Sequence, residues 1–252
     1  KDDMLGKVRA DLEKAHKGIP NRLVMYAIGY WENDLDGVKA NTILGKDKYD
    51  DLIQTIDVAA PYLYPVPYQP VASVGDAVGR AAAVTSSKKP LLPILQLFAW
   101  DVKERYPTPS ELKCMVYLSL IQGANGIGYY SYGSVTGKKD TTIAKEQPEL
   151  WQAACAVNKE VITIATYLAN GTVDSSVSMG EGGAEVKLKA VKHKEGGVIL
   201  LANTAGAAKT VSLQVPAGSK ALKRLDGGKE VAVDGGKATV VLQPFEAVGL
   251  QY

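Results

Sequence analysis

Four strongly apolar segments recur at a nearly constant spacing through the first half of the chain. They begin at residues 23, 57, 91 and 126, so successive segments start 34 or 35 residues apart. Patterns typical of helices lie at residues 4–16, 46–55, 73–83, 108–122 and 148–168. A strand with the helix that follows it takes about this length, and continuously apolar strands are typical of a parallel sheet covered by helices. The spacing therefore predicts four successive βα units.

The helix predicted at residues 108–122 has the clearest start signal in the chain. Thr108 stands at the N-cap position, Pro109 at the first helical position, and Glu111 at the position that completes a capping box. Gly123 supplies a C-terminal stop. We therefore expect this helix to begin directly after Thr108.

The pattern changes after Gly171, where an alternation of period two replaces the helical period. Short strand-like segments follow at residues 185–191, 198–202, 210–215, 229–233, 238–242 and 247–251. Glycine-containing turns separate most of them, as in antiparallel hairpins. We therefore expect two domains, a βα domain at residues 1–170 and a β-sandwich at residues 171–252.

Four βα units fit either a small open sheet or one half of a closed eight-stranded barrel. The open, doubly wound sheet would be expected to carry a glycine-rich phosphate loop, and the chain has no such motif. Bulky aromatic residues follow the strands instead, at the place where barrel enzymes build their sites. The expected fold class is therefore α/β, with the C-terminal half of a TIM (β/α)8 barrel followed by an all-β antiparallel sandwich. The implied partner is an N-terminal barrel half, in preceding sequence or on a companion chain. A self-sufficient four-stranded α/β domain is the alternative.

Charge and composition exclude several other classes of protein. The 29 Lys and Arg residues nearly balance 27 Asp and Glu residues, which gives no reason to expect nucleic acid as a partner. No apolar run approaches the roughly 20 residues of a membrane-spanning helix, so no membrane span is expected. His16 and His193 lie far apart, and Cys114 and Cys155 fall in helical patterns. We therefore expect no metal site, no cofactor and no disulfide framework.

Several segments resemble a known family of proteins. They are residues 58–65 (VAAPYLYP), 93–100 (PILQLFAW), 105–115 (RYPTPSELKCM) and 123–132 (GANGIGYYSY). In this order they are similar to the later part of a family of bacterial (β/α)8-barrel proteins related to glycoside hydrolases, in which a β-sandwich follows the barrel. Such proteins commonly carry an acid in an Asp-Glu-Pro-like motif on strand four, and retaining ones a Glu nucleophile after strand seven. This chain has no Asp-Glu-Pro motif, and the segment that resembles strand seven offers Gln96, Trp100 and Asp101 instead.

Two carboxyl groups at expected strand ends are the catalytic candidates. Glycoside hydrolysis requires a pair, about 5 Å apart for retention and roughly 6.5–9.5 Å apart for inversion. Glu32 could act as an acid or a base, or it could be a loop carboxylate or helix cap. Asp101 could act as a base or orient a sugar hydroxyl, or it could form a salt bridge with Lys103 or Arg105. Part of the active site is expected outside this chain.

Tyrosine dominates the aromatic residues, with 13 Tyr against three Trp and two Phe. A ring with a hydrogen-bonding tip suits the recognition of sugars, whose flat faces are apolar and whose edges are polar. The expected substrate-binding residues are Tyr30, Trp31, Tyr62, Tyr64, Gln96, Trp100, Tyr130 and Tyr132. Packing at the barrel rim is the alternative for the aromatic members of this set.

These residues predict a carbohydrate-active protein that acts on a poly- or oligosaccharide at the barrel mouth. Glycoside hydrolysis is the expected reaction, carbohydrate is the expected partner, and the expected location is extracellular, periplasmic or at the cell surface. A non-catalytic carbohydrate-binding or structural cell-surface protein is the alternative, because a barrel can keep its cleft and lose its carboxyl pair.

Overall fold

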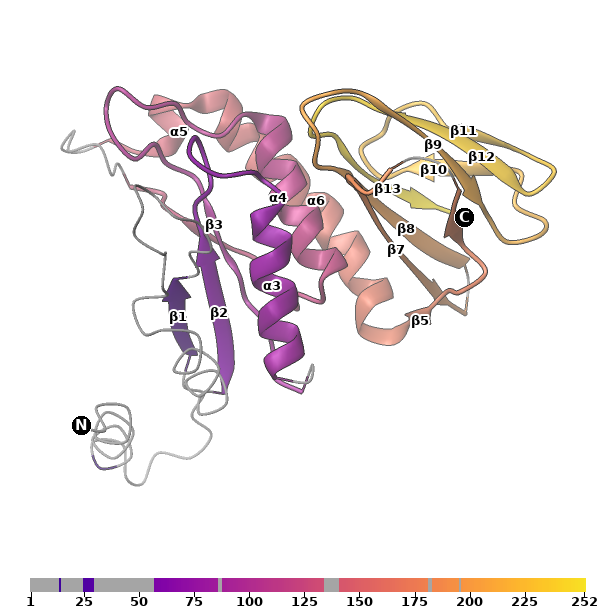
Figure 1. The fold of residues 1–252 in the computed structure, drawn as a ribbon, viewed down its shortest axis with the longest axis horizontal. Helices are drawn as coiled ribbons and strands as arrows, with labels where there is room; N and C mark the ends of the chain where they lie inside the picture. The colour runs from indigo at the N-terminus through magenta and orange to yellow at the C-terminus, as the bar shows by residue number, and fades with distance from the viewer. Residues whose placement is uncertain are drawn as a thin grey trace.

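The computed structural model describes residue 14 and residues 25–29, 57–85, 88–133, 141–180, 183–194 and 196–252. Within these residues a parallel sheet and an antiparallel sheet lie on opposite sides of a layer of helices (Figure 1). The helix predicted at residues 46–55, and all but residue 14 of the one predicted at residues 4–16, lie outside them. No helix of this described part is long and apolar enough to cross a membrane.

The parallel sheet has four strands in the described residues, and their spatial order follows the order of the chain. They are β1 (Met25–Gly29), β2 (Val58–Leu63), β3 (Ile94–Gln96) and β4 (Gly128–Tyr130). Each falls within one of the four apolar segments of the sequence. A doubly wound sheet reverses its strand order at a switch point, whereas a barrel keeps each strand beside the next. The observed order is therefore that of a barrel segment.

Helices pack on one face of this sheet (Figure 1). α3 (Ser73–Val84) packs against β2 and α4 (Pro109–Ile121) against β3, while the long α6 (Pro148–Asn170) packs against α4 and the short α5 (Ile143–Glu146) against α6. The capping box of α4 is confirmed, because Thr108 Oγ1 accepts a hydrogen bond from Glu111 N at 3.2 Å and Glu111 Oε2 accepts one from Thr108 N at 2.8 Å. This start leaves residues 97–108 as a loop that follows the carboxyl end of β3.

The antiparallel sheet follows α6 without a linker and curls back on itself. Its nine strands within the described residues are hydrogen-bonded in the order β5-β7-β8-β13-β10-β11-β12-β9-β6. The strands are β5 (Thr172–Val173), β6 (Ser178–Met179), β7 (Val186–His193), β8 (Gly196–Asn203), β9 (Lys209–Gln214), β10 (Ala221–Arg224), β11 (Val231–Asp234), β12 (Lys237–Leu242) and β13 (Ala247–Gln251). Ile199 and Leu201 of β8 share one apolar core with Val211 and Leu213 of β9. The all-β antiparallel portion predicted from the sequence is therefore confirmed, as a single curled sheet with its core inside.

Helix α4 joins the two sheets. Its residues from Leu112 to Leu120 are buried except for the half-buried Lys113. A helix that is buried on all sides requires packing partners on all sides. The parallel sheet covers one side, and β8 and β13 contact α4 from the other, so that Leu200 and Ala247 belong to the same core as Met115. The parallel and antiparallel portions therefore share a core.

Candidate functional site

Five aromatic side chains meet at the carboxyl edge of the parallel sheet. We call them the aromatic platform: Tyr62, Tyr64, Phe98, Trp100 and Tyr130. Tyr64 lies at the centre, with its ring stacked on Tyr62 at a centroid distance of 5.2 Å and on Tyr130 at 5.9 Å. The rings of Phe98 and Trp100 meet Tyr64 edge to face at 5.0 and 6.0 Å. Such offset and edge-to-face contacts fix the orientation of each ring.

The strand ends explain why these rings meet. Tyr64 follows β2 directly, Phe98 and Trp100 follow β3, and Tyr130 is the last residue of β4. The carboxyl ends of parallel strands lie at the same edge of a sheet, which is where barrel enzymes place their sites. Tyr30, Trp31 and Glu32 follow β1 in the sequence and lie outside the described residues.

One side of the platform is open to solvent. Trp100 is 36% exposed and Tyr130 is 47% exposed, while Phe98 is only 5% exposed and supports the other rings from below. Burial, together with the nearby phenols of Tyr62 and Tyr130, raises the pKa of Tyr64 well above its usual value. The Tyr64 hydroxyl therefore stays protonated at physiological pH and can donate a hydrogen bond. Phe98 was not among the residues predicted from the sequence.

Gln96 lies beneath the platform and not on its open side. Its side chain is 0% exposed, and its carboxamide is bonded to the backbone of Val66 and Phe98. The sequence predicts Gln96 as a substrate-binding residue, whereas in the structure its side chain is buried and bonded to the backbone of Val66 and Phe98. The physical reason is that its hydrogen-bonding groups serve the protein backbone.

Tyr132 forms a second aromatic group with Trp151 of α6. Their ring centroids are 5.3 Å apart at an interplanar angle of 64°, and Tyr132 is 56% exposed. The sequence predicts Tyr132 as a substrate-binding residue, and no contact between Tyr132 and the platform rings is found among the described residues. Trp151 lies on α6, more than 20 residues after the end of β4, so the argument from strand ends could not find it.

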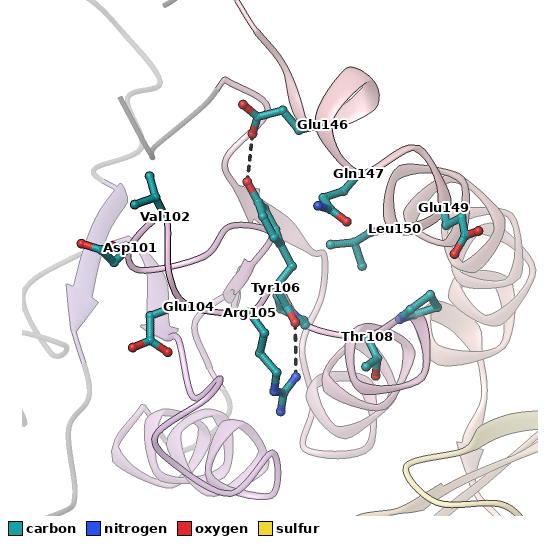
Figure 2. Close-up of a pocket in the computed structure, with 12 residues that line it drawn as sticks. Asp101, Val102, Glu104, Arg105, Tyr106, Thr108, Glu146, Gln147, Glu149 and Leu150 are labelled. Atoms are coloured by element: carbon teal, nitrogen blue, oxygen red, sulfur yellow. Dashed lines mark hydrogen bonds between the residues drawn. The ribbon is translucent and has the colours of Figure 1, made fainter. Parts of the chain in front are cut away.

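A cleft of about 580 Å³ lies beside the loop that carries Asp101 (Figure 2). Its lining includes the carboxylates of Asp101, Glu104, Glu146 and Glu149 and the ring of Tyr106. Figure 2 shows the Tyr106 side chain extending toward Glu146, to which its hydroxyl donates a hydrogen bond of 2.9 Å. The charged groups of the lining are therefore mostly acidic, with four carboxylates and the guanidinium of Arg105, and the sequence analysis identified only Asp101 among the carboxylates.

Asp101 is exposed and accepts a hydrogen bond on Oδ1 from the backbone N–H of Lys103 at 3.1 Å. Arg105 instead forms a two-pronged pair with Glu111, at 2.7 and 2.8 Å. In place of the salt bridge considered from the sequence, Asp101 contacts the backbone of Lys103, and Arg105 pairs with Glu111. The second oxygen of Asp101 can face a ligand from the loop next to Trp100.

No group of three or more His, Cys, Asp or Glu side chains in the described parts of the chain is arranged to hold a metal ion. Cys114 is buried on α4 and Cys155 is exposed on α6, and both are free thiols. The aromatic platform and the cleft offer flat ring faces, hydrogen-bonding groups and carboxylates.

The chain is similar in fold to parts of solved glycoside hydrolase structures. No protein-family model matches the chain, and no curated protein sequence matches it. Among solved structures, the GH42 β-galactosidase Gan42B of G. stearothermophilus is similar with a TM-score of 0.62 and 9% sequence identity, over 98% of this chain and 66% of that one. A noncanonic maltogenic α-amylase, AmyB from Thermotoga neapolitana, is similar with a TM-score of 0.52 and 10% identity, over 99% of this chain and 58% of that one.

At these identities the similarity is one of fold. The chain spans 66% of the β-galactosidase chain and 58% of the α-amylase chain. The fold predicted from the sequence, a parallel βα portion followed by an antiparallel sheet, is therefore confirmed as one that matches part of these barrel proteins.

Proposed function

We propose that this chain is the C-terminal part of a carbohydrate-active barrel protein and that it binds a saccharide on the aromatic platform. The observation that carries the proposal is the pair of exposed rings, Trp100 and Tyr130, packed around the half-buried Tyr64 at the carboxyl edge of the sheet. The apolar faces of sugar rings stack on aromatic rings, and phenol hydroxyls can bond the sugar hydroxyls at the edge. Tyr132 and Trp151 would provide a second contact for a longer saccharide.

The reaction that we propose is glycoside hydrolysis. It requires two carboxyl groups on either side of the glycosidic bond. Asp101 is one candidate, because it follows the exposed Trp100 and keeps one carboxylate oxygen away from its Lys103 contact. Glu32, which follows β1 in the sequence, is the other candidate within this chain.

We further propose that additional βα units complete the barrel, on the same polypeptide or on a companion chain. β1 and β4 are the outer strands of the four-stranded sheet in the described residues, and a closed barrel of this type has eight strands. The completing strands would bring further carboxyl groups to the same edge. A polysaccharide substrate would place the protein outside the cell, in the periplasm or at the cell surface.

Saccharide binding without hydrolysis is the second candidate function. The observation that favours it is the exposed position of Asp101 in a turn that its own carboxylate stabilises through Lys103. A catalytic acid is commonly desolvated so that it remains protonated near neutral pH, and an exposed turn does not provide that environment.

Oligosaccharide binding tests the proposal directly. Titration calorimetry with galactotetraose, xylohexaose and maltohexaose should detect binding of at least one of them. Trp100→Ala and Tyr130→Ala should each weaken that binding about tenfold, as expected when an aromatic contact worth about 1–2 kcal/mol is removed. Ile162→Ala serves as the control, because Ile162 is exposed on α6 and belongs to neither aromatic group. Unchanged affinity in both platform variants would contradict the proposal.

Release of reducing ends separates the two candidate functions. If Asp101 takes part in hydrolysis, Asp101→Asn should reduce the rate of release and leave the affinity for the saccharide within about threefold. A completed barrel that binds the oligosaccharide and releases no reducing ends would favour the binding protein.

A further inference from the structure

Gln96 lies where three strand ends meet. It is the last residue of β3 and pairs with Tyr130 of β4, while the neighbouring Leu95 pairs with Leu63 of β2. Each of these strands carries a part of the platform at or just beyond its end. The residue is therefore placed to control how the strand ends sit relative to one another.

The carboxamide of Gln96 continues the β2–β3 pairing beyond the last paired residues. Its Oε1 accepts a hydrogen bond from Val66 N at 2.9 Å, and its Nε2 donates to Val66 O at 2.7 Å. The second proton of Nε2 is donated to Phe98 O at 3.0 Å. Both donor positions of the amide are thus occupied, and the side chain pairs with Val66 as a peptide group in a ladder would.

These bonds join the two loops that carry most of the platform. Val66 lies two residues after Tyr64, and Phe98 lies two residues before Trp100. Tyr68 and Glu104 form a second bridge between the same loops, with Tyr68 Oη donating to Glu104 Oε1 at 2.8 Å, but this bridge is exposed. Buried hydrogen bonds hold geometry more firmly than exposed ones, because water does not compete for their groups.

We propose that Gln96 is the positioning residue of the aromatic platform: it fixes Tyr64 against Trp100 through Val66 and Phe98 and does not touch the saccharide. The proposal rests on the saccharide-binding function proposed above. Preorganised rings lose less conformational freedom on binding, so releasing the two loops lowers affinity even though every ring is still present.

Substitution with Glu preserves the shape of the side chain and changes its donors. In Gln96→Glu the ionised carboxylate would face the carbonyl oxygens of Val66 and Phe98 and would have no proton to donate to either. The protonated carboxyl regains one donor and can again pair with Val66 through both of its oxygens. Burial favours the protonated form, so lowering the pH should restore the platform in this variant.

The experiment combines near-ultraviolet circular dichroism of the free protein with binding of galactotetraose, xylohexaose and maltohexaose. At about pH 8, Gln96→Glu should alter the aromatic circular dichroism and weaken binding about tenfold, and at about pH 5 both should return to within about threefold of the unmodified protein. Gln152→Glu is the matched control, because Gln152 is exposed on α6, and it should match the unmodified protein at both pH values.

Gln96→Met keeps the test decisive if the buried charge prevents folding. This neutral side chain of similar length should change the aromatic signal and weaken binding about tenfold at both pH values. Normal circular dichroism and normal affinity of Gln96→Met would overturn the proposal. So would weakened binding with an unchanged aromatic signal, which would mean direct contact with the sugar. If the unmodified protein binds none of the three probes, the proposed function fails, and the circular dichroism of the free variants still tests the positioning role.

Discussion

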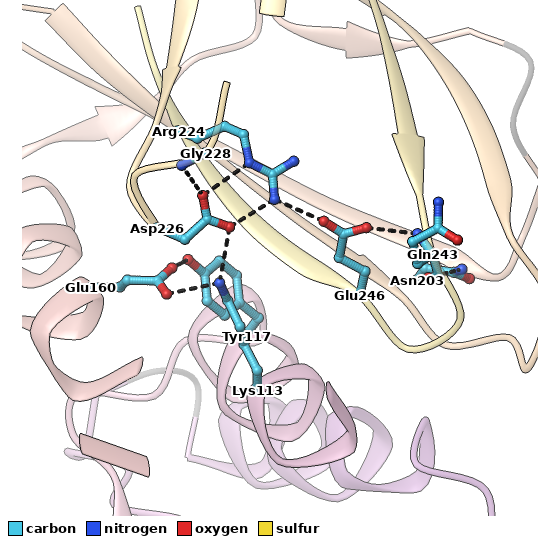
Figure 3. Close-up of polar contacts among 9 residues, drawn as sticks. All are labelled: Lys113, Tyr117, Glu160, Asn203, Arg224, Asp226, Gly228, Gln243 and Glu246. Atoms are coloured by element: carbon cyan, nitrogen blue, oxygen red, sulfur yellow. Dashed lines mark hydrogen bonds and ion pairs between the residues drawn. The ribbon is translucent and has the colours of Figure 1, made fainter. Parts of the chain in front are cut away.

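Removing one oxygen atom from Tyr117 should destabilise the protein by about 2 kcal/mol. Tyr117 of α4 is fully buried, and its hydroxyl donates a hydrogen bond to Glu160 of α6 (Figure 3). Burial, reinforced by the charge of Glu160, raises the pKa of Tyr117 far above its usual value, so the hydroxyl remains a donor. Glu160 also pairs with Lys113 at 2.8 Å, and Lys113 reaches Asp226 at 3.4 Å.

The magnitude follows from the charge of the acceptor. A hydrogen bond to a charged group contributes about 1.5–3 kcal/mol, and Tyr117→Phe preserves the ring and its packing. Lys113 remains paired with Glu160, which keeps the expected loss near 2 kcal/mol and not at the upper end. For a chain of this size the melting temperature should fall by roughly 4–8 °C.

Urea unfolding followed by far-ultraviolet circular dichroism measures the change, with an unchanged slope as evidence that only stability has altered. Tyr129→Phe is the matched control: it removes the same atom, but the Tyr129 hydroxyl bonds Asn158 at 2.8 Å in an exposed position. The control should lose less than about 1 kcal/mol. Equal free energies of unfolding for the two variants would refute the assignment of the Tyr117–Glu160 bond as a stabilising link between α4 and α6.

Three further predictions concern the same fold. Hydrogen bonds from Arg224, above all, hold the pKa of Asp226 below its usual range. A pKa that is lowered in the folded state gives stability that is present above about pH 4 and is lost as the pH falls. The urea midpoint should therefore fall less steeply between about pH 6 and pH 3 for Asp226→Asn than for the unmodified protein. Thr108→Ala removes the N-cap of α4 and should cost about 1 kcal/mol in urea unfolding, with the exposed Ser110→Ala as its neutral counterpart. In Gly197→Ala the new methyl group would lie 2.1 Å from Tyr252 Cζ, so that the ring must move; a melting temperature equal to that of the unmodified protein would contradict the expected loss of about 1–3 kcal/mol.

The architecture could be predicted from the sequence because two strong local signals agree with it. The regular spacing of apolar segments marks each strand of the parallel sheet, and the capping box marks the start of α4. The lengths of the strands could not be predicted as well from the sequence. The apolar segment at residues 91–100 contains only three residues of β3, yet Leu97, Phe98 and Ala99 beyond it are also buried. Apolar patterning reports burial, whereas a strand is defined by hydrogen bonding, and the two differ at this edge.

The sequence predicts only those residues of the site that lie at or just after the ends of the parallel strands. Tyr64, Trp100 and Tyr130 meet as expected because parallel strands end together. Tyr132 lies two residues further on and packs against Trp151 of α6, because the chain has already left the sheet. The carboxylates that line the cleft depend on the path of loops and on the position of α5, and neither has a periodic signature.

The shared core has a consequence for how the antiparallel sheet can serve the platform. An accessory domain that moves independently needs a small or polar interface with its neighbour. Here β8 contributes Val198, Leu200 and Ala202 to the core that contains α4, and separating the portions would expose these side chains together with the buried Glu160. Exposing apolar surface is costly, and opening the interface would also break the ion pair between Lys113 of α4 and Asp226 of the antiparallel portion. We therefore expect the antiparallel sheet to brace the helices that support the strand ends, and so to stabilise the platform from behind without moving toward the saccharide.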